Sequence, residues 1–196
     1  MFRSLAVASL LAFGWVLYCA GFAVADEQLS DGHPHVLIVV GPSSHPPGSH
    51  EVAAGGRVMK HCVENMLNVS GVRASVVTTW PRDLELLAAV ETVVFIGDTF
   101  PPHRMEHAKA IMASLDQMMD RGCGIVCVHY ATGLLGKDVA DDGDHPLLHW
   151  LGGYFANGSC PHHESIARIY PAARIAPDAT GHPISRGWKA FTLNDE

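Results

Sequence analysis

An α/β domain with a mostly parallel sheet covered on both faces is the fold class that the sequence predicts. Continuous apolar runs alternate along the chain with segments of helical periodicity. The first run, residues 35–40, is apolar almost throughout, which is typical of a parallel strand buried on both faces. About 170 residues follow the hydrophobic N-terminus, enough for one domain with a substantial core. We therefore expect a flavodoxin-like or Rossmann-like three-layer sandwich.

The predicted elements follow one another as strand, loop and helix. Strands are expected at residues 35–40, 72–77, 91–97 and 124–129, and helices at 51–67, 83–89 and 102–121. Right-handed crossovers between these strands produce a parallel sheet. After residue 130 the alternation of strands and helices is less regular. We expect a loop at 133–146, a helix at 147–151 and a strand at 164–170. Residues 181–196 contain no helix to cover the last strand, so we expect the domain, residues 35–196, to be truncated at its C-terminus.

The first 25 residues have the pattern of a secretory signal. Arg3 precedes an apolar run from residue 5 to residue 25, which closes with Ala23, Val24 and Ala25. We expect cleavage after Ala25 and a secreted or periplasmic protein. The run is almost long enough to span a bilayer, so an uncleaved signal is the alternative and would be the protein's one link to a membrane.

Charge and cysteine content exclude some classes of protein. The formal net charge is −7 and there is no basic run, so we expect no nucleic-acid partner. Four cysteines remain after residue 25, too few for a disulfide scaffold. Cys123 and Cys127 lie four residues apart on one predicted strand, which is too far for a disulfide between them.

Histidine is unusually frequent, with 13 residues, most of them beside Gly, Pro, Ser or another His. Histidine in turns can bind a metal or transfer protons near neutral pH. Polar segments at 41–51, 97–103 and 129–133 each follow a predicted strand, at the sheet edge where such folds bind ligands. The segment 41–51 has neither a GxGxxG pattern nor a P-loop lysine, which excludes a nucleotide cradle. Its imidazoles, carboxylate and hydroxyls suit sugar hydroxyls or a metal, and a plain loop with Ser49 capping the helix is the alternative.

The end of the fourth strand has the form of a nucleophile elbow, where a buried strand turns sharply into a helix. When residues 124–128 are aligned with the strand before the elbow of glutamine amidotransferases, His129 stands at the position of their catalytic cysteine. Cys127 lies two residues earlier, where we expect it to pack in the core. Neither a thiol nucleophile nor a G-x-S-x-G serine is present at the elbow.

Four segments carry a resemblance to a known family: HVLIVVGPSSHPPGSHE, GCGIVCVHYATG, HWLGGYF and GHPISRGWKAFTLNDE. In this order they resemble the ThuA-like family, named after a trehalose-utilisation protein, within the class I glutamine amidotransferase-like superfamily. The resemblance covers essentially the whole mature chain. It implies a flavodoxin-like three-layer sandwich and a role in sugar breakdown, often in exported bacterial proteins.

Individual residues match the motifs of that family. His129 matches the histidine after the fourth strand, Trp150 opens the W-x-G-G motif, and His182 opens the H-P-I-x-x-G motif. Residues 195–196 match the start of a D-E-x-Y motif whose aromatic would follow the last residue. The Cys/His/Glu triad of glutaminases has no counterpart, so amidotransferase activity is not expected.

The leading hypothesis is an enzyme of carbohydrate catabolism, a hydrolase, lyase or isomerase acting on trehalose, another glycoside or an oxidised sugar. The catalytic candidates are His129, Tyr130 and His45, and the substrate-binding candidates are Ser44, His50, Glu51, Trp150 and Tyr154. Two chemistries remain open: acid/base catalysis by imidazoles, or a divalent metal such as zinc held by His45, His50, His129 and His162 with a carboxylate such as Glu51.

The alternative is a non-catalytic module that binds a sugar or a protein partner. Trp150, Tyr154 and Trp188 would then stack on a pyranose ring. In either case the expected ligand is a small carbohydrate, and a homo-oligomer is compatible with the sequence. Of the neighbouring His162 and His163, at most one is expected to share a site with Glu164, because adjacent residues of an extended segment point to opposite faces.

Overall fold

The computed structural model of the protein describes residues 32–162, 165–166, 168, 170–178 and 181–193. The predicted signal, His163, Glu164 and residues 195–196 lie outside these ranges. The chain divides into two compact units, residues 1–132 and 133–196, and each is considered by itself. Within the described ranges, no helix has the length and apolar character needed to cross a membrane.

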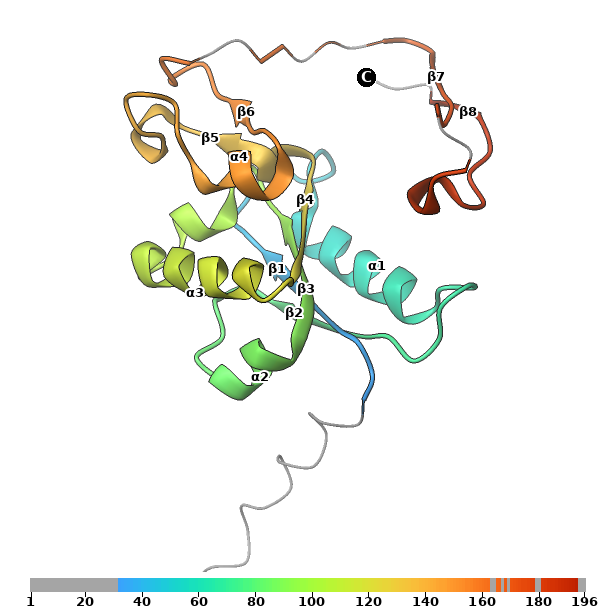
Figure 1. Cartoon of the computed structure of the whole chain (residues 1–196). Helices are drawn as coiled ribbons and strands as arrows, with labels where there is room; N and C mark the ends of the chain where they lie inside the picture. Colours follow the sequence, from blue (N-terminus) through green and yellow to red (C-terminus); the bar gives the residue numbers. More distant parts are fainter. Residues whose placement is uncertain (1–31, 163–164, 167, 169, 179–180, 194–196) are drawn as a thin grey trace, which may run out of the picture. The chain divides into compact units, whose positions relative to one another are not determined.

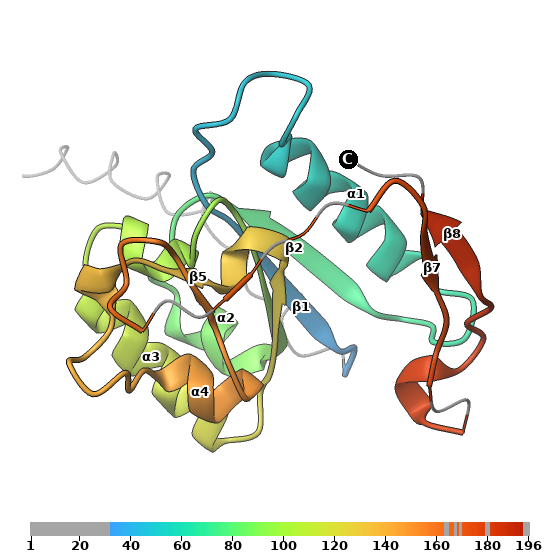
Figure 2. The same cartoon turned by 90° about the horizontal axis from the view of Figure 1, so that it is seen from above.

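The first unit is built on a parallel sheet with the strand order β2-β1-β3-β4. Its strands are β1 (His35–Val40), β2 (Arg73–Val77), β3 (Val90–Ile96) and β4 (Gly124–Val128). Helix α1 (Val52–Glu64) lies on one face of the sheet, and α2 (Leu84–Ala89) and α3 (Ala108–Asp120) lie on the other (Figures 1 and 2). The predicted α/β fold with a mostly parallel sheet is therefore confirmed.

Strand β1 is buried on both faces, as its continuous apolar run predicts. Ile38 and Val40 belong to the core on the α1 side, together with Val52 of α1. Leu37 and Val39 alternate with them and are also fully buried. Helix α1 approaches the sheet closely at Gly56, where an added Cβ would lie 2.6 Å from Cγ2 of Val40.

At two predicted elements of the first unit, a residue with a left-handed backbone changes the course that the sequence predicts. The helix expected at 102–121 is interrupted: a 3₁₀ turn, η1 (Pro101–Arg104), precedes α3, and His107 at the start of α3 has a left-handed backbone with φ of 62°. A left-handed residue cannot continue a right-handed helix, which explains the break. The fourth strand ends at Val128, because His129, with φ of 53°, turns the chain into η2 (His129–Thr132).

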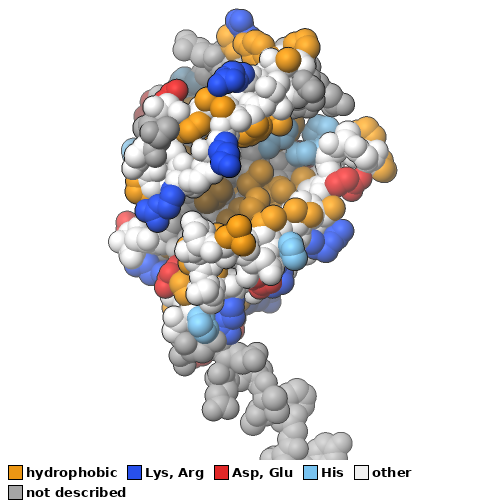
Figure 3. Space-filling model, turned by 90° about the vertical axis from the view of Figure 1, so that its right-hand side faces the viewer, with side chains coloured by type: hydrophobic (Ala, Val, Ile, Leu, Met, Phe, Trp, Pro, Cys, Tyr) orange, Lys and Arg blue, Asp and Glu red, His pale blue; other side chains and the backbone are white. Residues whose placement is uncertain are grey.

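Strand β4 is an edge strand of the four-stranded sheet. Val126 pairs in register with Val94, which belongs to the core on the α1 side, yet Val126 is 44% exposed. Apolar side chains are accordingly visible on the α1 side of the molecule, which faces the viewer in Figure 3. The sheet face beneath α1 is thus covered over β1 and only partly over β4.

The second unit contains short elements. Strand β5 (Gly133–Leu134) pairs in parallel with β6 (Phe155–Ala156), and β7 (Ala173–Ile175) pairs antiparallel with β8 (Phe191–Leu193). Helix α4 (Pro146–Leu151) forms where the sequence predicts a helix, with η3 (Gly136–Asp138) before it and η4 (Pro183–Ser185) near the C-terminus.

The strand predicted at 164–170 does not form in the residues that the structure describes. Ser165, Ile166, Arg168 and Tyr170 belong to no strand. A strand needs a neighbour for its backbone hydrogen bonds, and local β propensity alone does not supply one. In this unit the pairing partners are β6 for β5 and β8 for β7.

Candidate functional site

Three loops meet at the carboxyl ends of β1, β3 and β4, which are neighbours in the sheet. The loop after β1 carries His45 and His50, the segment after β3 carries Asp98, and η2 after β4 carries His129 and Tyr130. In parallel sheets the loops at this edge converge, which brings together residues far apart in the sequence. We refer to His45, His50, Asp98, His129 and Tyr130 as the histidine cluster.

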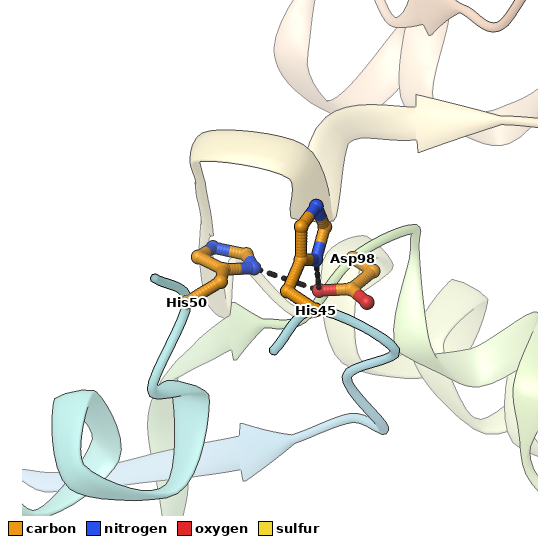
Figure 4. A group of neighbouring side chains, drawn as sticks. All are labelled: His45, His50 and Asp98. Carbon is orange, nitrogen blue, oxygen red and sulfur yellow. Dashed lines mark hydrogen bonds and ion pairs between the residues drawn. The ribbon is translucent and has the colours of Figure 1, made fainter. Parts of the chain in front are cut away.

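Both loop histidines point toward the carboxylate of Asp98 (Figure 4). Its Oδ1 is 2.7 Å from Nδ1 of His50 and 3.0 Å from Nδ1 of His45. Its Oδ2 accepts hydrogen bonds from the backbone N–H and, at 3.1 Å, from the hydroxyl of Ser44. Each of these contacts links the carboxylate to residues 44–50 of the β1 loop.

Asp98 is ionised over the physiological pH range. Its partial burial by itself would raise the pKa of the carboxyl group. Hydrogen bonds from the Ser44 backbone N–H and from the side chains of His50 and His45, together with the nearby hydroxyl of Ser43, outweigh this effect and hold the pKa of Asp98 well below its usual range. An ionised carboxylate can only accept hydrogen bonds, so the Nδ1 atoms of His45 and His50 must be the donors. In the neutral imidazoles, Nε2 is then the unprotonated nitrogen.

His129 and Tyr130 complete the cluster through ring contacts. The rings of His50 and His129 pack edge to face with their centroids 5.3 Å apart. Tyr130 stacks on His45 at 5.9 Å and packs edge to face on His50 at 5.6 Å. The left-handed backbone of His129 is the sharp turn expected of an elbow, and such strain is concentrated at functional sites.

The cysteines have no role in this cluster. Burial raises the pKa of the Cys127 thiol to about 12, so the thiol is protonated at neutral pH and is a poor nucleophile. In register with β3, Cys127 pairs with the fully buried Phe95. Cys62, Cys123, Cys127 and Cys160 are all free thiols, which confirms that Cys123 and Cys127 are not bonded to each other.

Ser44 and Glu51 organise the β1 loop. Ser44 binds Asp98 through its backbone and its hydroxyl. Oε1 of Glu51 accepts a hydrogen bond from the backbone N–H of Gly48 at 2.7 Å. Ser49 does not cap α1, because Glu51 is the residue at the N-cap and the Ser49 hydroxyl donates to the carbonyl of Pro46. The predicted roles of Ser44 and Glu51 in substrate binding stay predictions.

Sequence reasoning misses Asp98. The residue falls in the polar segment 97–103, on the predicted ligand-binding edge, but no motif assigns its carboxylate to the histidines. The signal that identifies it is position: Asp98 is the second residue after the end of β3, which pairs with β1. Glu51, the carboxylate that the sequence suggests instead, is bound to the backbone of its own loop.

A metal could be held by part of the cluster. Among the residues that the structure describes, His45, His50 and Asp98 form a group whose ligand atoms lie within 4.8 Å of one another. Imidazole nitrogens and a carboxylate oxygen suit zinc and similar divalent ions. His129 is not in this group, and its predicted role as a ligand stays a prediction.

The remaining predicted site residues, Trp150, Tyr154 and His162, belong to the second unit. Nε2 of His162 lies 3.0 Å from the carbonyl oxygen of Asp141, and the hydroxyl of Tyr154 donates to the carbonyl of Gly143 at 2.9 Å. Burial, with smaller contributions from Cys160 and Asp144, raises the pKa of Tyr154. Their participation in the cluster of the first unit stays a prediction.

Comparisons with known proteins add a similarity of fold. No protein-family model matches the chain, and no curated protein matches it. Among solved structures, the chain is similar to the crystal structure of a protein provisionally named ThuA-like from Bacteroides uniformis ATCC 8492, with a TM-score of 0.53 and 16% sequence identity. The similarity covers 91% of this chain and 62% of that one, so the chain spans less than two thirds of its neighbour's length. At this identity the likeness concerns the fold alone, and it supports the ThuA-like resemblance to that extent.

Proposed function

We propose that this protein is an exported enzyme of carbohydrate breakdown that transfers protons with histidines oriented by Asp98. The observation that carries the proposal is the contact of one carboxylate oxygen, Oδ1 of Asp98, with Nδ1 of both His45 and His50. A structural histidine needs no such arrangement, whereas a carboxylate that fixes the tautomer of a catalytic histidine recurs in unrelated enzymes. The ThuA-like name of the structural neighbour supports a sugar as the substrate class.

The chemistry follows from the tautomer. With the proton on Nδ1, the unprotonated Nε2 of His50 or His45 can act as a general base. It would take a proton from a sugar hydroxyl, or from a carbon beside the carbonyl group of an oxidised sugar. We assign His129 and Tyr130 as further catalytic groups, because their rings pack against these imidazoles. Ser44 and Glu51 of the β1 loop remain candidates for binding the substrate.

A second version of the same function uses a divalent metal such as zinc. The proximity of the His45, His50 and Asp98 ligand atoms favours it. Nδ1 of each histidine would then lose its proton to make room for the metal, and His129 would be a candidate for a further ligand. The metal would polarise a carbonyl or hydroxyl oxygen of the sugar.

Turnover of a panel of glycosides and oxidised glycosides tests the proposal. We expect His50→Ala to lower kcat by about 100-fold or more, the usual contribution of an acid/base group. His61→Ala is the matched control, because His61 is an exposed residue of α1 whose side chain lies beside Asn65 and not in the cluster. Unchanged turnover in His50→Ala would refute the assignment. Binding of sugars without turnover of any panel member would support the binding module instead.

Metal analysis of the purified protein separates the two chemistries. Stoichiometric zinc together with loss of turnover on chelation would establish the metal version. Full turnover in protein freed of metal by a chelator would establish acid/base catalysis. Export is tested separately by N-terminal sequencing of protein recovered from the periplasm or medium, where we expect the mature chain to begin at Asp26.

A further inference from the structure

A large groove opens in the first unit at the start of the β1 loop, which further along carries His45 and His50 of the histidine cluster. It has a volume of about 1260 Å³, and its lining comes from the end of β1, the start of α1, the loop after β2 with α2, and the segment from η1 into α3. This is the carboxyl edge of the sheet near β1 and β3, between which the strand order reverses, and ligands of open α/β folds bind at such points. The volume exceeds what a single sugar ring requires, since typical pockets for drug-sized ligands measure about 300–1,000 Å³.

The groove and the histidine cluster share the β1 loop. Ser43 lines the groove, and its hydroxyl accepts the backbone N–H of His45 and donates to the carbonyl oxygen of His50, both at 3.3 Å. Arg104 also lines the groove, and its Nε donates to the hydroxyl of Thr99, the residue after Asp98. A ligand in this groove therefore lies against the residues that position the candidate catalytic side chains.

Most of the lining surface is apolar. Val40, Leu87 and Ile111 are buried residues that reach the groove, and Trp80 offers an indole ring at its side. Leu84 also lines the groove and is 78% exposed. Such a lining is suited to a flat apolar group rather than to a second ring covered with hydroxyls.

We infer that this groove binds a flat apolar ring attached to the sugar, such as the aryl aglycone of a glycoside, while the sugar itself lies at the histidine cluster. The inference rests on the proposed function for the position of the sugar. It narrows the substrate class from glycosides in general to glycosides of aromatic or similarly flat apolar alcohols. Arg82 and Arg104 at the groove would face the polar edge of that ring.

Binding of two matched ligands to the full-length protein tests the inference by calorimetry. The ligands are 4-nitrophenyl β-D-glucoside and methyl β-D-glucoside, which differ in the ring. Burial of an aryl ring predicts that the wild-type protein binds the first about 10- to 100-fold more tightly. Free 4-nitrophenol should compete with the aryl glucoside. Equal affinities for the two glucosides, or no competition, would overturn the inference without any variant.

Two substitutions on α3 locate the binding. Ala110 and Ala113 are both exposed residues of this helix, but only Ala110 lines the groove. We expect Ala110→Trp to remove the preference for the aryl glucoside and Ala113→Trp to retain it. Circular dichroism checks that both variants fold. Retention of the preference in a folded Ala110→Trp variant would overturn the inference.

The outcomes separate this inference from the proposed function. If aryl binding depends on Ala110 but no glycoside is turned over, the inference about the groove is supported and the proposed enzymatic function is refuted. If turnover depends on His50 but aryl glucosides are not preferred, the proposed enzymatic function is supported and the inference about the groove is refuted. Tighter binding of trehalose than of the aryl glucoside would also refute the inference, because it would place a second sugar in the groove.

Discussion

Replacement of Asp98 by Asn perturbs the histidine cluster at its centre. The carboxylate accepts hydrogen bonds from Ser44, His45 and His50, and Asn supplies one neutral acceptor together with an amide donor. Because the amide can donate, it favours Nδ1 as an acceptor and moves the imidazole proton to Nε2. The variant should therefore lose the base, with a fall in kcat of about 10²–10⁴-fold, the upper value being that known for loss of the aspartate of serine-protease triads.

The cost to stability can be worked from the same contacts. A hydrogen bond to a charged group contributes about 1 kcal/mol more than a neutral one. Of the three partners, Ser44 is exposed and the His45 side chain is 40% exposed, so their contributions are discounted for solvent screening. The His50 side chain is 19% exposed and keeps most of its share. A total near 2 kcal/mol follows, equivalent to a Tm lower by about 4–8 °C for a chain of this length.

Thermal unfolding followed by circular dichroism measures this difference, with Asp144→Asn as the matched control. Asp144 also pairs with a histidine, His149, at 3.1 Å, but the two side chains are 61% and 71% exposed. An exposed pair of this kind contributes little, so the control should change the free energy of unfolding by less than about 0.5 kcal/mol. Equal Tm values for the two variants would refute the central role of Asp98.

The pH dependence gives an independent check. The pKa of Asp98 is lower in the folded protein than in the unfolded chain, where a carboxyl of this type titrates near about 3.9. Its stabilisation is thus fully present above about pH 4 and is lost as the pH falls toward the folded pKa. The Tm difference between the wild type and Asp98→Asn should shrink in acid. A difference of equal size at pH 7 and at about pH 2.5 would contradict the linkage.

Three further predictions concern the framework of the site. With its pKa raised to about 12, the Cys127 thiol should react with iodoacetamide at pH 8 about 100-fold or more slowly than the exposed Cys62, and equal rates in mass-spectrometric labelling would contradict its burial. Because His129 has φ of 53°, His129→Gly should be more stable than His129→Ala by about 1 kcal/mol in urea unfolding, and equal midpoints would show that the turn is unstrained. Gly56→Ala should destabilise the protein by about 1–3 kcal/mol, because the new Cβ would lie 2.6 Å from Cγ2 of Val40. Gly55→Ala should cost less, since its Cβ would meet only the flexible end of Ile96, and the reverse order would contradict the packing of α1.

Much of the first unit is predictable because its pattern is local. Strand β1 occupies the residues of its apolar run, and Asp83 caps α2 at the start of its predicted helix. The break before α3 is not predictable in the same way. Hydrophobic periodicity runs through it, while the left-handed backbone of His107 depends on how the chain packs after η1.

The candidate site also combines features that the local sequence predicts with features that depend on tertiary packing. Sequence position places His45, His50, His129 and Tyr130 on loops at one edge of a parallel sheet. The pairing of β1 with β3 and of β3 with β4 brings those loops together and adds Asp98 in contact with the imidazoles of His45 and His50. The groove lined by Trp80 and Leu84 is not predictable from the sequence, because its walls come from four separate segments.

The sequence by itself determined the fold class, the edge of the sheet where the polar loops lie, and the absence of a thiol at the elbow. These properties follow from periodicity and from residue type, which are local. Only the tertiary structure decided which carboxylate meets the histidines, and therefore which imidazole nitrogens carry protons. That choice depends on distances of about 3 Å between residues some 50 positions apart, and such distances are set by strand order and loop packing.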